Sequence, residues 1–210
     1  MIFLYLFAYT LCVIRFIDNR VLKILYIAAL SVIIAFIAFV GGIFLWQATE
    51  KTFFYPVKYK EEIISSADTY GLERKTVFAM VKTESGFNKN AESNKGAKGL
   101  MQITDDTANY IAALRNIAVF DIKDVSTNLD FGCYYLRYLI NKFKSVDTAI
   151  AAYNAGEGTV EKWLKDPNCS KNGLTLYRIP YRETENYLKK IEKNEKKYNK
   201  LYGNILDKNK

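Results

Sequence analysis

Residues 77–86 read Val-Phe-Ala-Met-Val-Lys-Thr-Glu-Ser-Gly and place one acidic residue in an otherwise apolar helical stripe. Val77, Met80 and Val81 recur at intervals of three and four residues, which is the spacing of one face of an α-helix. The next position on that face is Glu84, and Gly86 then stops the helix. An acid therefore stands where the pattern expects an apolar side chain.

The surroundings predicted for Glu84 favour its protonated form. Burial disfavours the charged carboxylate and raises its pKa, and the last turn of a helix disfavours an anion as well. A carboxyl group that stays protonated near neutral pH can serve as a general acid. The pattern alone also allows a glutamate at a helix end that turns to solvent.

A second carboxylate, Glu183, follows the extended segment Ile-Pro-Tyr-Arg at residues 179–182. Glu183, Tyr187 and Ile191 share one helix face, so Glu183 is placed to point inward, into a cleft or a polar network. An acidic residue is also favourable in the first turn of a helix, and that simpler interpretation stays open.

Two glycine-containing segments complete the set of candidate site residues. The glycines of residues 96–103 permit tight turns and close backbone approach, so this loop can present Gln102 to a ligand. It lacks the spacing and the Lys-Ser/Thr pair of a phosphate loop. Residues 152–156 end a helix with the polar pair Tyr153 and Asn154, for which core packing and a helix C-cap are the alternative roles.

The region after residue 57 repeats the helix period and contains few alternating strand patterns, so we expect a mostly α-helical domain. The predicted helices span residues 61–70, 73–84, 105–115, 128–144, 147–155, 159–165 and 183–202.

Residues 24–46 contain no charge and exceed the roughly 20 residues that cross a bilayer. Arg15, Arg20 and Lys23 flank one end, so the positive-inside rule places that end in the cytoplasm and the rest of the chain outside the membrane. A cleaved signal peptide is the alternative, although the run is long and no small-x-small cleavage site follows it.

These features divide the chain into four predicted parts. Residues 1–50 form a membrane anchor, within which the short apolar run 1–14 is either an extra span or an upstream extension. Residues 51–57 are a linker and residues 58–193 a catalytic domain. Residues 194–210 are expected to form a basic, solvated helical tail.

The chain has no histidine and three cysteines, Cys12, Cys133 and Cys169. The absence of histidine removes Ser-His-Asp and Cys-His nucleophile schemes as well as the usual His-based zinc sites. No Cys-x-x-Cys pair is present, so no metal and no cofactor is expected. A disulfide between Cys133 and Cys169 is left open.

The formal net charge of +8 suits a polyanionic environment, such as a cell wall or nucleic acid, or simply solubility. The lysine-rich C-terminus contains no recognised nucleic-acid motif, and its aromatic residues are not interleaved with the charge in a stacking pattern. Nucleic acid is therefore not expected as a partner.

Taken together, the segments resemble the lytic transglycosylase family with the goose-type-lysozyme-like fold, in a membrane-anchored form. The blocks that carry the resemblance are residues 84–87, 96–103, 107–108, 151–156, 160, 163, 179–184 and 187. Their order matches the family over about residues 58–193. Asp105 stands where family members often carry a proline, and aspartate also suits a helix start.

The resemblance implies a lysozyme-like helical domain with a long groove for peptidoglycan glycan strands. It implies that Glu84 protonates the β-1,4 glycosidic oxygen between N-acetylmuramic acid and N-acetylglucosamine. The same side chain then acts as a base on the muramyl 6-hydroxyl, which gives a 1,6-anhydromuramyl product without consuming water. One carboxylate suffices here, whereas ordinary glycosidases use two.

The resemblance also implies roles for the other candidates. Ser85 positions the Glu84 region or the substrate, and Glu183 lies near Glu84 as a supporting polar residue. The side chains expected to line the cleft and bind sugar are Met101, Gln102, Tyr153 and Asn154. Met101 has core filling as its alternative role.

Two alternatives to this function stay open. The first is a muramidase of the same fold, in which water attacks with help from Glu183 or an aspartate. The second is a non-catalytic glycan-binding module for wall assembly, which has no need of an inward-facing acid. Protein partners, the cellular process and endo or exo action are not predicted.

Overall fold

The computed structural model describes residue 9 and residues 19–207. It separates the chain into two compact units, Met1–Phe54 and Tyr55–Lys210. Cys12 and nearly all of the short apolar run 1–14 lie outside the described residues.

The first unit contains α2, Arg20–Thr49, which continues as the short π-helix η1, Glu50–Phe54. The side chain of Asn19 caps α2 by accepting a hydrogen bond from the Val21 amide at 3.0 Å. None of the residues of α2 is buried, although nearly all are apolar. Among the described residues, Arg20–Phe54 is the one helix long and apolar enough to cross a membrane, so it is a candidate membrane span.

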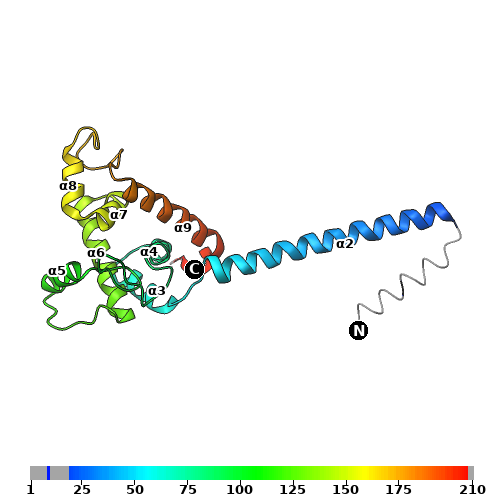
Figure 1. The fold of residues 1–210 in the computed structure, drawn as a ribbon, viewed down its shortest axis with the longest axis horizontal. Coiled ribbons are helices and arrows are strands. Elements are labelled where there is room, and N and C mark those ends of the chain that lie inside the picture. The colour runs from blue at the N-terminus through cyan, green and yellow to red at the C-terminus, as the bar shows by residue number, and fades with distance from the viewer. Residues whose placement is uncertain (1–8, 10–18, 208–210) are drawn as a thin grey trace. The chain divides into compact units, whose positions relative to one another are not determined.

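The second unit is built from helices, and the described residues contain no strand beyond isolated bridges in the loop that follows α4 (Figure 1). Each helix predicted from the sequence is present, with ends that differ by a few residues at most. The helices are α3 (Lys60–Thr69), α4 (Arg74–Glu84), α5 (Asp105–Arg115), α6 (Val125–Phe143), α7 (Val146–Ala155), α8 (Glu157–Lys165) and α9 (Arg182–Leu206). The expected mostly α-helical fold is thereby confirmed.

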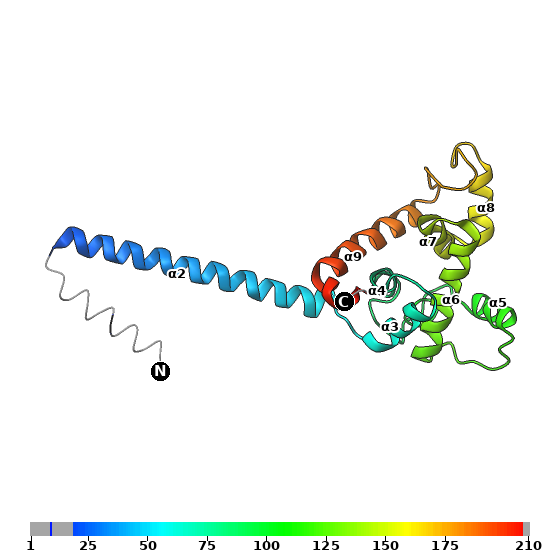
Figure 2. The same cartoon turned by 180° about the vertical axis from the view of Figure 1, so that it is seen from behind.

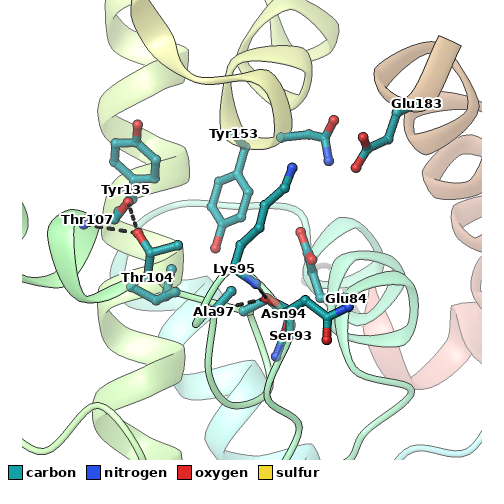
Figure 3. Close-up of a pocket in the computed structure, with 13 residues that line it drawn as sticks. Glu84, Ser93, Asn94, Lys95, Ala97, Thr104, Thr107, Tyr135, Tyr153 and Glu183 are labelled. Atoms are coloured by element: carbon teal, nitrogen blue, oxygen red, sulfur yellow. Dashed lines mark hydrogen bonds between the residues drawn. The ribbon is translucent and has the colours of Figure 1, made fainter. Parts of the chain in front are cut away.

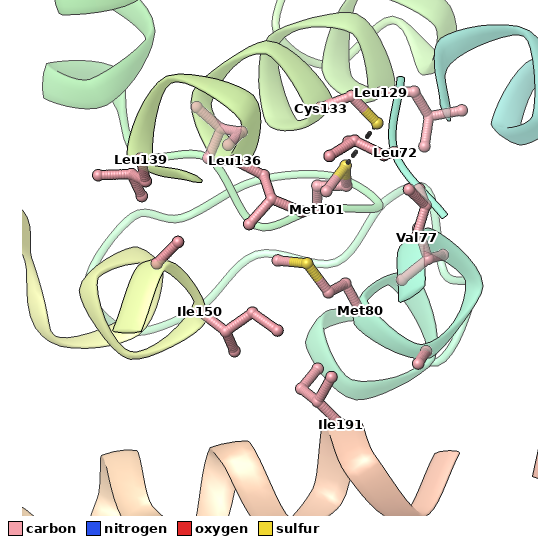
Figure 4. Close-up of a cluster of buried hydrophobic side chains, with 14 of the residues drawn as sticks. Leu72, Val77, Met80, Met101, Leu129, Cys133, Leu136, Leu139, Ile150 and Ile191 are labelled. Carbon is pink, nitrogen blue, oxygen red and sulfur yellow. Dashed lines mark hydrogen bonds between the residues drawn. The ribbon is translucent and has the colours of Figure 1, made fainter. Parts of the chain in front are cut away.

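Helix α6 is central to the core of the second unit and packs against α3, α5 and α7. Both views show α5 on one flank of α6 and α9 on the other side (Figure 1, Figure 2). Leu129, Leu136 and Leu139 of α6 are fully buried, and Met80 of α4 and Ile191 of α9 face the same apolar cluster (Figure 4). The apolar stripes predicted from residue spacing thus meet in one core.

The starts of α5, α6 and α7 are fixed by side-chain caps that the sequence supplies. Thr104 accepts from the Thr107 amide at the start of α5, and Asp124 accepts from the Thr127 amide at the start of α6. Asp105 is the first residue of α5 and forms an ion pair with Lys98 at 2.7 Å. This pair ties the loop before α5 to the helix that follows it.

The predicted solvated tail from residue 194 is wrong, because α9 continues as a packed helix to Leu206. Tyr198 is fully buried against the rings of Phe78 and Phe87. Its hydroxyl donates to the Pro56 carbonyl at 2.9 Å. The many lysines of this segment conceal an apolar stripe at the helix period, so the segment belongs to the folded unit.

Cys133 and Cys169 are both buried and both free, so no disulfide joins them. Cys133 lies in the core of α6, with its sulfur 3.9 Å from the sulfur of Met101.

Candidate active site

Glu84 is the last residue of α4, and its side chain lines a cavity of about 370 Å³. The four residues before Lys82 are fully buried, which fixes the register of the helix and turns Glu84 toward the cavity (Figure 3). The other lining residues are Ser93, Asn94, Lys95, Ala97, Gln102, Ile103, Thr104, Thr107, Tyr135, Tyr153, Asn154 and Glu183. We call this space the Glu84 cavity.

The Glu84 carboxyl group is half-buried and does not turn out to bulk solvent. Burial raises its pKa to about 7, and a hydrogen bond from Tyr187 opposes part of that rise. Among the described residues, no lysine or arginine forms an ion pair with it. The carboxyl group therefore holds its proton close to neutral pH, as the sequence pattern predicted.

Tyr187 donates its hydroxyl hydrogen to Oε1 of Glu84 at 2.5 Å. Burial and the nearby Glu84 carboxylate raise the pKa of Tyr187 well above its usual value, so the phenol remains a donor. The sequence placed Tyr187 on the inward face of its helix but assigned it no role. Its i, i+4 spacing from Glu183 is the sequence signal that could have placed Tyr187 at the same site.

Ser85 joins the loop after α4 to the helix itself. Its hydroxyl lies 2.9 Å from the carbonyl of Leu100 and 3.1 Å from that of Val81. Ser85 does not line the Glu84 cavity, so its geometry fits positioning of the Glu84 region and not contact with a ligand there.

Gln102 lines the cavity with its backbone in the left-handed region at φ 48°. Its side-chain amide donates to the carbonyls of Ala91 at 3.2 Å and Gly99 at 3.1 Å. These bonds hold the loop in a closed turn and leave the side-chain oxygen of Gln102 as an acceptor.

Met101 was predicted to line the cleft. In the structure it is fully buried and does not line the Glu84 cavity. Its side chain fills the space above Gly132, where an added Cβ would lie 2.4 Å from the Met101 sulfur. The core-filling role therefore describes Met101. Its backbone still serves the site, because its carbonyl accepts a hydrogen bond from the Tyr153 hydroxyl at 2.9 Å.

Tyr153 and Asn154 line the cavity from the end of α7. Burial and then the Glu84 carboxylate raise the pKa of Tyr153 well above its usual value. Asn154 accepts a hydrogen bond from the hydroxyl of Thr184 at 2.7 Å. No described residue accepts from the Asn154 side-chain NH₂, which leaves this donor free for a ligand carbonyl.

Glu183 is exposed, and its carboxylate faces the cavity from the start of α9 (Figure 3). No hydrogen bond joins it to Glu84. The structure thus brings both predicted carboxylates to one cavity, and only Glu84 is withdrawn from solvent.

Several lining residues were not predicted. Lys95 lies in a polar loop whose sequence resembles any solvated loop, and Thr104 and Thr107 follow the pattern of an ordinary helix cap. Tyr135 of α6 reaches the cavity by packing its ring 5.5 Å from that of Tyr153. Within the described residues, no cluster of acidic or cysteine side chains has the geometry to hold a metal ion.

Comparison with known proteins gives the class to which this fold and site belong. The sequence model of the Transglycosylase SLT domain matches residues 61–173, and the chain belongs to this family. The soluble lytic murein transglycosylase of Escherichia coli is 29% identical over 153 residues, which cover 70% of this chain and 23% of that protein. The membrane-bound lytic murein transglycosylase C of Haemophilus influenzae is 31% identical over 166 residues, which cover 67% and 46%.

Solved structures give the same family. An inactive glutamate-to-glutamine mutant of the lytic transglycosylase Slt from Pseudomonas aeruginosa superposes with a TM-score of 0.61 at 26% identity, covering 73% of this chain and 26% of that one. The 70-kDa soluble lytic transglycosylase in complex with bulgecin A gives a TM-score of 0.62, also at 26% identity, covering 71% and 25%. The chain spans less than half the length of these relatives.

Proposed function

We propose that this chain is a peptidoglycan lytic transglycosylase in which Glu84 is the catalytic acid. The observation that carries the proposal is a half-buried carboxyl group at a cavity, with its pKa raised to about 7 by burial. Membership of the SLT family supports this activity over that of a glycan-binding module. Binding alone gives no reason to keep a proton donor out of solvent.

In the proposed reaction, Glu84 gives its proton to the oxygen of the β-1,4 bond that links N-acetylmuramic acid to N-acetylglucosamine. The bond from the anomeric carbon to that oxygen breaks, and the muramyl 6-hydroxyl oxygen attacks the anomeric carbon. The Glu84 carboxylate takes the hydroxyl proton and is ready for the next cycle. The product is a 1,6-anhydro ring, and water does not enter the balance.

Tyr187 suits both halves of this cycle. Its hydroxyl orients the Glu84 carboxyl group through the 2.5 Å bond, and it stabilises the carboxylate that exists after the first proton transfer. A donor that strengthens its bond as charge develops lowers the barrier to that transfer. We therefore assign Tyr187 as a positioning residue.

The remaining site residues are proposed to bind the sugars. The free NH₂ of Asn154 is placed to donate to an acetamido carbonyl, and Gln102 and Tyr153 line the same cavity as Glu84. Ser85 acts through the loop that it fixes to α4.

A hydrolytic muramidase is the second candidate, because Glu183 lines the same cavity as Glu84 and inverting glycosidases use a second carboxylate to activate water. Digestion of peptidoglycan in ¹⁸O-labelled water by the detergent-solubilised full chain separates the two reactions. Mass spectrometry should find 1,6-anhydromuramyl ends without label. Labelled reducing ends alone would establish the hydrolase instead.

We further propose that Arg20–Phe54 anchors the enzyme in the cell membrane with the second unit on the extracytoplasmic side. The support is the length of this apolar helix and the basic residues Arg20 and Lys23 at its start. Protease added to intact cells should degrade the second unit. Protection of that unit until the membrane is opened would place it in the cytoplasm, and a mature chain lacking residues before 50 would indicate a cleaved signal peptide.

A further inference from the structure

Five arginines lie in the described part of the second unit, and three of them have evident structural partners. Arg74 pairs with Asp68 at 2.6 Å, and Arg115 pairs with Asp130. Arg137 donates to the backbone carbonyls of the turn after α3. Arginine commonly forms such ion pairs and hydrogen bonds within a protein, because its planar guanidinium offers several donors in a fixed geometry.

The two other arginines, Arg178 and Arg182, line one cavity of about 520 Å³. Neither guanidinium forms a hydrogen bond or a close ion pair with any residue that the structure describes, although the carboxylates of Asp166 and Glu185 interact electrostatically with Arg178 and Arg182, respectively. Glu185 also lines this space, but its carboxylate is paired with Lys189 at 2.5 Å. The cavity, which we call the arginine cavity, therefore has a net positive charge and unused donors.

The backbone that carries Arg178 is held by its own loop. The amides of Tyr177 and Arg178 lie 2.9 Å and 3.3 Å from the carbonyl of Cys169, and the Tyr177 hydroxyl donates to the Pro167 carbonyl at 2.9 Å. Arg182 is the first residue of α9. The backbone positions from which both side chains project are thus fixed, although both residues are exposed.

The arginine cavity and the Glu84 cavity are lined by consecutive residues at the start of α9. Arg182 lines the first space, and the next residue, Glu183, lines the second. A glycan in the Glu84 cavity that carried a branch could therefore extend it past Glu183 toward the two guanidinium groups. Leu176, Ile179 and Pro180 give the arginine cavity an apolar wall that suits the carbon skeleton of a peptide.

We propose that Arg178 and Arg182 bind a carboxylate of the stem peptide that branches from the glycan strand. This inference rests on the proposed function. A guanidinium pairs with a carboxylate through two parallel hydrogen bonds, which gives both affinity and orientation. The enzyme would then prefer peptide-bearing strands to bare ones, and the branch would help to set which sugar faces Glu84.

The test compares peptide-bearing glycan strands with strands from which an amidase has removed the peptides. The variant is Arg178→Gln/Arg182→Gln in the full chain. Lys190→Gln/Lys193→Gln is the matched control, because it removes the same charge from exposed positions of α9. We expect the arginine variant to raise KM for peptide-bearing strands by about tenfold. It should leave KM for bare strands unchanged, and the lysine control should affect the two substrates equally.

The outcomes separate this inference from the proposed function. Equal loss on both substrates, or no loss on either, would overturn the peptide subsite while the 1,6-anhydro product of the parent still supported the enzyme. A defect that vanished when acid removed phosphodiester-linked wall polymers, and not when peptides were removed, would assign the arginines to phosphate instead. Failure of the parent to cut either substrate would overturn both proposals.

Discussion

The Tyr187 hydroxyl lies 2.5 Å from Oε1 of Glu84 and joins two residues that are 103 positions apart in the chain. Glu84 ends α4, and Tyr187 lies in α9, which packs along α4. Burial raises the pKa of Glu84 and this bond lowers it, so that the two effects together set a value of about 7. The long C-terminal helix thus fixes both the position and the acidity of the proposed proton donor.

The pH dependence of the parent enzyme follows from that value. Because the first step needs protonated Glu84, kcat/KM should fall as the pH rises through about 7. Initial rates of glycan cleavage in a series of buffers at constant ionic strength measure this limb. A rate that stayed constant or rose through this region would mean that Glu84 does not act as the acid.

Replacing Tyr187 by phenylalanine removes the hydrogen bond that favours the charged form of Glu84. The pKa of Glu84 should then rise, so the alkaline limb of the pH–rate profile moves to higher pH while kcat falls because the carboxyl group is less well oriented. Tyr198→Phe is the matched control, since it removes a bond from α9 to the carbonyl of Pro56, and neither residue lines the Glu84 cavity. An alkaline limb that stays in place in Tyr187→Phe would contradict the role of this hydrogen bond in setting the pKa of Glu84.

The acidity of Glu84 also has a consequence for stability. Its folded-state pKa is about 7 against a usual value of 4.5, so the folded state binds the proton more tightly than the unfolded state does. The stabilisation of the folded state by this tighter proton binding is complete below about pH 4.5 and is lost as the pH rises through about 7. Glu84→Gln, which does not titrate, should therefore raise Tm relative to the parent at about pH 8 and change it little at about pH 4.

Thermal unfolding followed by circular dichroism at the two pH values provides this comparison. Glu62→Gln, an exposed substitution on α3, serves as the control and should leave Tm nearly unchanged at both. Identical effects of Glu84→Gln on Tm at both pH values would show that the carboxyl group is solvated like an ordinary surface acid.

Much of the fold could be predicted because helix periodicity reports which residues face inward. Val77, Met80 and Val81 defined a stripe that correctly led to Glu84, and the same rule located the other helices. The rule was not applied to residues 194–206, where Lys196, Lys197 and Lys200 make a packed helix look solvated. The average polarity of this segment wrongly indicated exposure to solvent. The spacing of its apolar residues correctly indicates a helix face that packs against the core.

The parts of the site that could not be predicted depend on contacts between distant segments. Met101 is buried because Gly132 leaves room for its side chain on another helix, and local sequence does not encode that pairing. The hydrogen bond between Tyr187 and Glu84 and the approach of Tyr135 to the cavity are of the same kind. The spacing of residues along the chain assigns a side chain to one face of a helix. The contacts that this face makes with distant segments depend on the tertiary fold.

The fit of Met101 against Gly132 gives a prediction about packing. An alanine Cβ at position 132 would lie 2.4 Å from the Met101 sulfur, so Gly132→Ala should lower the free energy of unfolding by about 1–3 kcal/mol. Gly158→Ala in α8 is the control, because nothing lies within 4 Å of its Cβ, and it should be neutral or stabilising. Urea denaturation of the two variants measures both effects, and equal stability would show that the core adapts around Met101.

The most direct test of Glu84 is cleavage of peptidoglycan by the Glu84→Gln variant of the full chain, assayed beside the parent with circular dichroism and glycan-binding measurements on the same preparations. Glutamine keeps the size of the side chain and cannot donate a carboxyl proton. We predict that cleavage falls by at least about 100-fold while the fold and glycan binding are kept. Cleavage at the parental rate by the folded variant would contradict the assignment of Glu84 as the catalytic acid.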